Sequence, residues 1–301
     1  MLKENPSFTA KFCAFARAYH SNYAKEKIYD DYLAFDFLGK EEYEDIRDLI
    51  ISILNNKSWQ IPDIKTWDEF LDELIAPVIL TRMKYAEEKL LQYAKRKGKI
   101  QYVICGAGLD TFAFRNTNKN IGIFELDHPN THNYKIDRIR QLEWNIPDNT
   151  HYIPIDFEKQ NIRDTLLENG FKEELPAFFA ILGVAYYLEL TALVKTLEEI
   201  SKAVKAESLL VFDYPDKMLI SEEHTRMQVL KDITSGVGEQ MKGGMTEEDL
   251  VSELAKCDYT TEEVFAPRDI QEVLIGKKKL IAFKSIQFIT AKKREVMKGA
   301  E

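Results

Sequence analysis

Residues 1–98 carry apolar positions at helical spacing between charged stretches. The clearest stripe lies in 78–95, where apolar residues recur every three or four positions, at Ile79, Met83, Ala86, Leu90 and Ala94. This spacing places them on one face of a helix, and Gly98 follows where a helix is expected to end. We therefore predict a helical N-terminal segment over 1–98.

From residue 99 the pattern changes to short apolar runs separated by amphipathic segments of helix length. The runs lie at 101–105, 121–126, 151–155, 177–182 and 208–213. Such alternation is typical of an α/β protein with a parallel sheet that is covered on both faces. Two later runs, 260–266 and 279–290, are joined near Gly276 and predict an antiparallel hairpin at the sheet edge.

The domain organisation predicted from this pattern has two parts. Residues 1–98 form a helical cover, and residues 99–301 form a ligand-binding core with an insertion near 215–245. The sequence shows neither an internal repeat nor a linker rich in Pro, Gly and Ser. Substrate specificity is expected in the cover and the insertion, because loops and additions distinguish proteins that share a fold.

The segment 102–111, YVICGAGLDT, is the strongest functional signal in the chain. An apolar strand runs into Gly106 and Gly108, and a second apolar run ends at Asp127, about twenty residues later. A strand followed by a glycine turn brings the backbone close to a ligand, and an acid at the next strand end is placed to bind a ribose. The pattern predicts a site for an adenosine-containing cofactor.

Two residues argue against a dinucleotide. The third glycine of the dinucleotide fingerprint is replaced by Thr111, and the carboxylate of Asp110 would repel a diphosphate. A further acid, Asp156, ends the following strand beside Asp127 and adds an acceptor for an amine or hydroxyl group. These features favour S-adenosylmethionine, which carries a sulfonium and an ammonium group.

Composition and charge exclude several other classes. The 41 basic and 50 acidic residues give a net charge of −9, which does not favour nucleic acid. The three cysteines are far apart in the sequence, which does not suggest a disulfide framework. His128 and His132 are spaced i,i+4, but no third metal ligand stands out near them. No apolar run is long enough to span a membrane. We expect a cytoplasmic protein without a metal; the sequence does not indicate an oligomeric state.

The chain resembles the leucine carboxyl methyltransferase family, including its bacterial O-methyltransferase branch. Four blocks carry the resemblance: CGAGLDT at 105–111 with Phe114-Arg115, ELDHP at 125–129, PIDFE at 154–158, and FF at 178–179 through Gly183-Val184 to YYL at 186–188. Weaker likeness reaches both ends of the chain, so it covers most of the sequence. It implies a Rossmann-like class I methyltransferase fold with a mainly parallel seven-stranded sheet, and S-adenosylmethionine as cofactor.

The resemblance also implies cofactor contacts. Gly106 and Gly108 would line the methionine part, and Asp127 would hold the ribose. Asp156 and Phe157 would frame the adenine. Arg82, in the helix before the first strand, would bind the cofactor carboxylate. The sequence departs from the family pattern at two positions. Some family members have a glutamate that contacts the cofactor where this chain has Leu182, and an arginine where this chain has Ala113.

The acceptor is less well indicated. A carboxylate acceptor needs no general base, and Arg17, Tyr187 or Arg226 are candidates to contact it. Tyr187, Tyr214 and Asp213 are the candidates for a base if the acceptor is an alcohol or phenol, and the catalytic residue stays unassigned. The leading hypothesis is an O-methyltransferase acting on a small molecule or a carboxylate. The alternatives are a dinucleotide-dependent oxidoreductase and a non-catalytic cofactor-binding protein.

Overall fold

The computed structural model describes residues 6–57, 66–242 and 244–293. The N-terminal part is helical, with helices α1 (Phe8–Tyr23), α2 (Ala34–Leu38), α3 (Lys40–Asn56), α4 (Trp67–Leu74) and α5 (Ala76–Lys97). The predicted helix over 78–95 is confirmed as the inner part of α5. Gly98 follows α5 with a φ of 78°, and Lys95, Arg96 and Lys97 lie in its last turn, where cations stabilise the helix dipole.

Strands and helices then alternate as the apolar runs predict. The strands are β1 (Ile100–Cys105), β2 (Ile121–Asp127), β3 (Thr150–Pro154), β4 (Ala177–Ile181), β5 (Ser208–Pro215), β6 (Tyr259–Phe265) and β7 (Ile286–Lys293). The helices between them are α6 (Phe112–Arg115), α7 (Pro129–Gln141), α8 (Ile162–Glu168), α9 (Leu190–Ala203), α10 (His224–Gly236), α11 (Glu247–Lys256) and α12 (Pro267–Asp269). Short helical turns lie at Ala185–Tyr187 and Ile220–Glu223.

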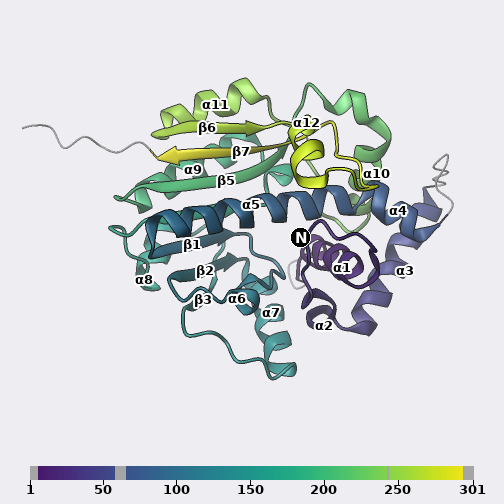
Figure 1. Cartoon of the computed structure of the whole chain (residues 1–301), viewed down its shortest axis with the longest axis horizontal. Coiled ribbons are helices and arrows are strands. Elements are labelled where there is room, and N and C mark those ends of the chain that lie inside the picture. Colours follow the sequence, from purple (N-terminus) through teal and green to yellow (C-terminus); the bar gives the residue numbers. More distant parts are fainter. Residues whose placement is uncertain (1–5, 58–65, 243, 294–301) are drawn as a thin grey trace, which may run out of the picture.

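The strands form one seven-stranded sheet in the order β3-β2-β1-β4-β5-β7-β6. The first five pair in parallel, whereas β7 is antiparallel to both β5 and β6. This arrangement confirms the predicted α/β fold with an antiparallel edge (Figure 1).

The predicted antiparallel pairing of the last two runs at the sheet edge is confirmed, but the connection between them is longer than a turn at Gly276. Gly276 ends a π-helix over Ile270–Ile275, and its N–H donates to the carbonyl of Gln271 at 2.7 Å. The strand expected over 279–290 begins only at Ile286, because residues 280–283 run as an irregular segment that is largely buried against the core.

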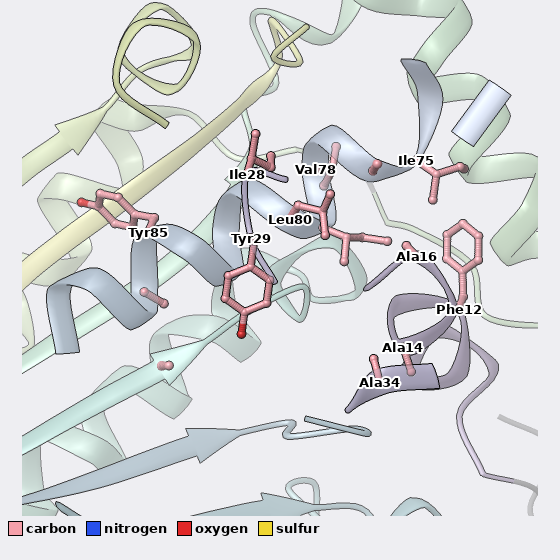
Figure 2. Close-up of a cluster of buried hydrophobic side chains, with 14 of the residues drawn as sticks. Phe12, Ala14, Ala16, Ile28, Tyr29, Ala34, Ile75, Val78, Leu80 and Tyr85 are labelled. Carbon is pink, nitrogen blue, oxygen red and sulfur yellow. The ribbon is translucent and has the colours of Figure 1, made fainter. Parts of the chain in front are cut away.

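Alternate strand residues enter two different apolar clusters. One cluster contains Tyr102 and Ile104 of β1 and extends through α5 to α1, while the other contains Val103 and Cys105 and includes residues of α8, α9 and α11. Side chains in a strand point alternately to opposite faces, so these helices cover opposite faces of the sheet. Figure 2 shows the part of the first cluster where Phe12 and Ala16 of α1 lie near Ile75 and Val78.

Helices α1–α4 gather at one end of the sheet, whereas α5 runs along it (Figure 1). Helix α5 packs directly against β1, β4 and β5. Helix α10, in the segment predicted as an insertion, packs against α3 and α4. The division of the chain at residue 98 into a cover and a core stays a prediction. In the part of the chain that the structure describes, no helix is both long and apolar enough to cross a membrane.

A buried ionic network joins the N-terminal helices to the core. The carboxylate of Asp31 is fully buried and accepts from Arg17 Nε at 2.8 Å, while Arg115 Nε lies 3.3 Å away. The hydroxyl of Thr111 donates to the same carboxylate. Arg17 also donates to the carbonyl of Leu109 at 2.6 Å, so the network fixes α1 against the loop that follows β1.

Replacing Asp31 with alanine should lower the free energy of unfolding by about 3–5 kcal/mol, because the buried guanidinium of Arg17 would lose its carboxylate partner and that of Arg115 would keep only Glu87. Urea denaturation measures this change. The neighbouring residue Asp30 provides the control, since it pairs with Lys27 at 3.2 Å on the surface and its alanine variant should be affected much less. Equal losses for the two variants would contradict the role given to Asp31.

Candidate functional site

The candidate site begins with the glycine turn, which we define as residues 106–108. Gly106 and Gly108 have φ angles of 78° and 53°, a region that residues with a side chain rarely adopt. The N–H groups of Gly106 and Ala107 donate to the carbonyl of Leu126 at 2.8 and 3.1 Å. The turn is therefore held against the carboxyl end of β2.

Asp127, the last residue of β2, completes this attachment. One carboxylate oxygen accepts from Gly108 N–H at 2.5 Å, and the other accepts from His128 N–H at 2.7 Å. Burial raises the pKa of this carboxyl group, and the two backbone donors oppose that shift. Each oxygen of an ionised carboxylate can accept more than one hydrogen bond, so Asp127 keeps capacity for ribose hydroxyls.

Asp156 and Phe157 follow the end of the neighbouring strand β3. The N–H of Ile155 donates to the Asp127 carbonyl at 2.8 Å, which brings the two strand ends together. The Asp156 carboxylate pairs with Lys159 at 2.6 Å, and this bond lowers its pKa. Phe157 is partly buried against the apolar cluster of α8 and α9. The sequence thus predicts correctly that both acids lie at the same edge of the sheet.

Arg82 lies on α5 and reaches the loop after β4. Its Nη1 is 3.4 Å from a carboxylate oxygen of Asp213, and its Nη2 donates to the Cys13 thiol at 3.0 Å. A Cβ on Gly183 would approach Arg82 Nη2 to 2.5 Å, so only glycine allows this contact. The Arg82 Nε is buried and has no partner among the described residues, which leaves a donor for a ligand.

Asp213 links these groups into one cluster at the end of β5. Its carboxylate accepts from Gly183 N–H at 2.6 Å and from the Tyr186 hydroxyl at 2.8 Å. The sequence offers Asp213 as a possible base, but the structure gives it three partners within a fully buried position. Asp213 therefore orients Arg82 and the loop at Gly183.

The predicted acceptor residues separate into two groups. Tyr187 lies near the site: its hydroxyl is 3.3 Å from that of Thr9, and it lines a cavity with Arg82 and Gly183. Arg17 is buried in the Asp31 network. Arg226 donates to the carbonyls of residues 73, 281 and 282 and stacks on Phe283. Both arginines hold the scaffold together, so we do not carry them into the proposed acceptor site.

The N-terminus of α1 covers the glycine turn. A Cβ on Gly108 would lie 3.1 Å from Ala10 Cβ. Glu239, in the loop after α10, accepts from the N–H groups of Phe8 and Thr9 at 2.8 and 3.0 Å and from the hydroxyls of Ser7 and Thr9. A carboxylate at a helix N-terminus binds the free N–H groups and the positive end of the dipole. The sequence pattern alone gives no role to Glu239, because its partners in α1 are 230 and 231 residues away in the chain.

A cavity of about 30 Å³ lies beneath this cover. It is lined by residues of α1, α5, α10 and the loop after β4, among them Thr9, Cys13, Arg82, Gly183 and Tyr187. This volume holds no more than a water molecule or two. A methyl acceptor does not fit in this volume, so the walls of the cavity must move apart before one can bind there. Among the residues described, no group of three or more His, Cys, Asp and Glu side chains could hold a metal ion.

The chain was compared with known proteins. The family model for leucine carboxyl methyltransferase matches residues 10–201. The chain belongs to this family. A Bacillus subtilis (strain 168) protein named "Putative S-adenosyl-L-methionine-dependent methyltransferase YktD" is 33% identical over 308 residues, covering 98% of this chain and 100% of the relative. The protein is thus a methyltransferase that depends on S-adenosylmethionine, as the glycine turn and strand-end acids predict.

Two solved structures share the fold over nearly the whole chain. A DUF574 family protein from Streptomyces avermitilis superposes with a TM-score of 0.63 at 10% identity, covering 96% of this chain and 98% of that one. A protein from Thermobifida fusca described as a "putative methyltransferase" gives 0.59 at 14% identity, with 96% of both chains covered. Both likenesses support the fold alone, including the helices that precede β1.

The residues around the glycine turn fit S-adenosylmethionine. The two glycines leave the backbone open, Asp127 has free acceptor capacity, and Arg82 keeps an unpaired donor in a buried position. All six predicted cofactor residues lie within the part of the chain that the family model matches. Their contacts with the cofactor stay predictions.

Replacing Asp127 with alanine should weaken S-adenosylhomocysteine binding by about 1.5–3 kcal/mol, or roughly ten- to a hundredfold, because a charged acceptor is lost from a buried site. Isothermal titration calorimetry measures this loss. Asp137→Ala is the matched control, since Asp137 lies on the exposed side of α7 and pairs with Arg140. Unchanged affinity in a folded Asp127 variant would rule out the ribose contact.

Replacing Glu239 with alanine should free the start of α1, because four hydrogen bonds to the segment 7–9 are lost. Limited proteolysis should then cut within residues 6–23 faster than in the wild type, and saturating S-adenosylhomocysteine should slow the cut in the wild type. The exposed residue Glu248 on α11 gives the control variant, Glu248→Ala. If both variants were cut at the wild-type rate, Glu239 would not hold the cover closed.

Proposed function

We propose that this enzyme is an O-methyltransferase whose acceptor is a small molecule with an ionised carboxylate. The observation that carries the proposal is the composition of the cavity under α1. Among the described residues, its lining includes the thiol of Cys13 and the phenols of Tyr186 and Tyr187 but no histidine and no carboxylate. A wall without a histidine or carboxylate base suits a nucleophile that is already ionised at neutral pH, as a carboxylate is.

The proposed cofactor contacts follow the sheet edge. Gly106 and Gly108 would line the methionine part, Arg82 would bind its carboxylate through Nε, and Asp127 would accept from the ribose hydroxyls. Asp156 and Phe157 would frame the adenine. When bound, S-adenosylmethionine supplies a methyl group that is already activated by the sulfonium. The task of the protein is then to exclude water and to align the acceptor oxygen with that methyl group.

The hydroxyl of Tyr187 suits a positioning role better than that of a base. Burial raises the pKa of this phenol, and its neighbour Thr9 opposes the shift only in part. A phenol that stays protonated can donate a hydrogen bond to an acceptor oxygen. Closure of α1 by Glu239 would place Thr9 and Tyr187 together above the acceptor.

The dinucleotide-dependent oxidoreductase is not retained, because the chain belongs to a methyltransferase family. A protein that binds the cofactor without transferring its methyl group is a possible outcome of the experiment below, since Leu182 provides no polar side chain at the site. A cytoplasmic location and an acceptor other than nucleic acid stay predictions from the sequence.

Incubation with methyl-labelled S-adenosylmethionine and a metabolite extract should yield a labelled product that releases methanol in alkali, because methyl esters hydrolyse and methyl ethers do not. Asp127→Ala should abolish the label at the same cofactor concentration. An alkali-stable product would overturn the carboxylate assignment while leaving the enzyme class intact. Binding of S-adenosylhomocysteine without any transfer would support the non-catalytic alternative.

A further inference from the structure

A buried ion pair between Glu125 and Lys135 lies next to the loop that contains the glycine turn. Glu125 precedes Asp127 by two residues in β2, and its side chain is 2% exposed. Lys135, on the inner side of α7 and equally buried, donates to the Glu125 carboxylate and to the carbonyl of Asp110 at 2.6 Å. The ammonium group of Lys135 therefore connects α7 to β2 and to Asp110, two residues after the glycine turn.

The surroundings of Glu125 contain more acid than base. The titratable groups that face it are Lys135 from α7, Asp110 from the loop after β1, Asp127 from β2, Tyr152 from β3 and Tyr102 from β1. Its second oxygen, Oε1, has no partner within the described part of the chain, and neither has the hydroxyl of Tyr152, which is opposite Glu125 in the sheet register. Among the described residues, Lys135 is the cation that lowers the pKa of Glu125, whereas Asp110 also faces the guanidinium groups of Arg17 and Arg115.

Ionisation of Glu125 is finely balanced in this position. Burial raises its pKa to about 7, and Lys135 opposes the shift. A proton on Glu125 would leave the ammonium group of Lys135 buried without the carboxylate that compensates it, which is strongly unfavourable. The Asp110 carbonyl would then be the remaining acceptor of the ammonium group, and the ionic link between α7 and β2 would be lost.

We propose that Glu125 and Lys135 are positioning residues for the cofactor, and that their ionised pair holds residue 110 and the glycine turn in the form that binds it. The pair acts through two connections already described. Lys135 holds the Asp110 carbonyl, and β2 carries Asp127, which accepts from Gly108. Neither side chain needs to touch the ligand for this role.

The experiment measures the affinity for S-adenosylhomocysteine by calorimetry over the range from about pH 6 to pH 8.5. For the wild type, the affinity should fall with decreasing pH below neutral, approaching about tenfold per pH unit where binding requires one ionised group. Glu125→Gln keeps the shape but cannot ionise, so its affinity should be low and nearly independent of pH. Lys135→Met should also bind weakly, and the double variant should lose less than the sum of the single losses.

A second readout needs no ligand and separates positioning from general stability. The pKa of Glu125 is raised from its usual value near 4.5, so the native wild type binds a proton that the unfolded chain has released. Between about pH 4.5 and pH 7, the contribution of Glu125 to thermal stability should therefore decrease as the pH rises. The affinity for S-adenosylhomocysteine should instead increase with pH in the upper part of this range. Glu125→Gln should remove both pH dependences. A variant that lost stability but kept the wild-type affinity profile would overturn the proposal.

Glu207→Gln is the matched control. Glu207 is also a carboxylate paired with a lysine, Lys97, at 2.8 Å. It directly precedes β5, so it lies at the amino ends of the parallel strands, away from the glycine turn at their carboxyl ends. This variant should keep the wild-type affinity and pH profile. If Glu125→Gln failed to fold, the wild type alone would test the proposal. Binding of S-adenosylhomocysteine at about pH 6.5 should release protons to the buffer. The measured heat of binding should then depend on the ionisation enthalpy of the buffer. Binding without proton release would contradict the proposal.

Discussion

The burial of one carboxylate, that of Asp31, links the N-terminal helices to the sheet. A charge without solvent is tolerated only when its partners are all in place. Arg17 comes from α1, Arg115 from α6, and the hydroxyl of Thr111 from the loop behind the glycine turn. The second guanidinium also meets Glu87 on α5, so two cations face two anions. The helices before β1 are therefore part of the site's foundation and more than a lid laid over it.

The sequence predicts the sheet well because four of the five parallel strands, all except the edge strand β3, are largely buried on both faces. Such strands appear as continuous apolar runs, and all five parallel ones are recovered to within one or two residues. Prediction fails at Gly276, where a glycine beside three lysines resembles a hairpin turn. The apolar residues that follow, Leu280 and Phe283, are buried by contacts with distant helices instead of strand pairing. Local pattern alone cannot distinguish these two kinds of burial.

Some residues of the candidate site can be predicted from the sequence, and others cannot. The glycine turn and the acids at residues 127 and 156 are predictable, since parallel strands end at a common edge. Arg17 and Arg226 are not, because the role of an arginine depends on which acceptors the fold brings to it. Glu125 and Lys135 did leave a signal that the sequence analysis passes over: a carboxylate within an apolar strand needs a partner. Which lysine serves it is decided only by the packing of α7 on β2.

The order of strands across the sheet has a consequence for how the chain folds. Strand β6 precedes β7 in the sequence, yet it reaches the sheet only through β7, which hydrogen-bonds to β5 on its other side. During synthesis β6 therefore has no partner strand in this sheet until the residues of β7 have left the ribosome. The parallel half of the sheet can form before then, complete with the glycine turn. The antiparallel half is complete only when β7 pairs with β5 on one side and with β6 on the other.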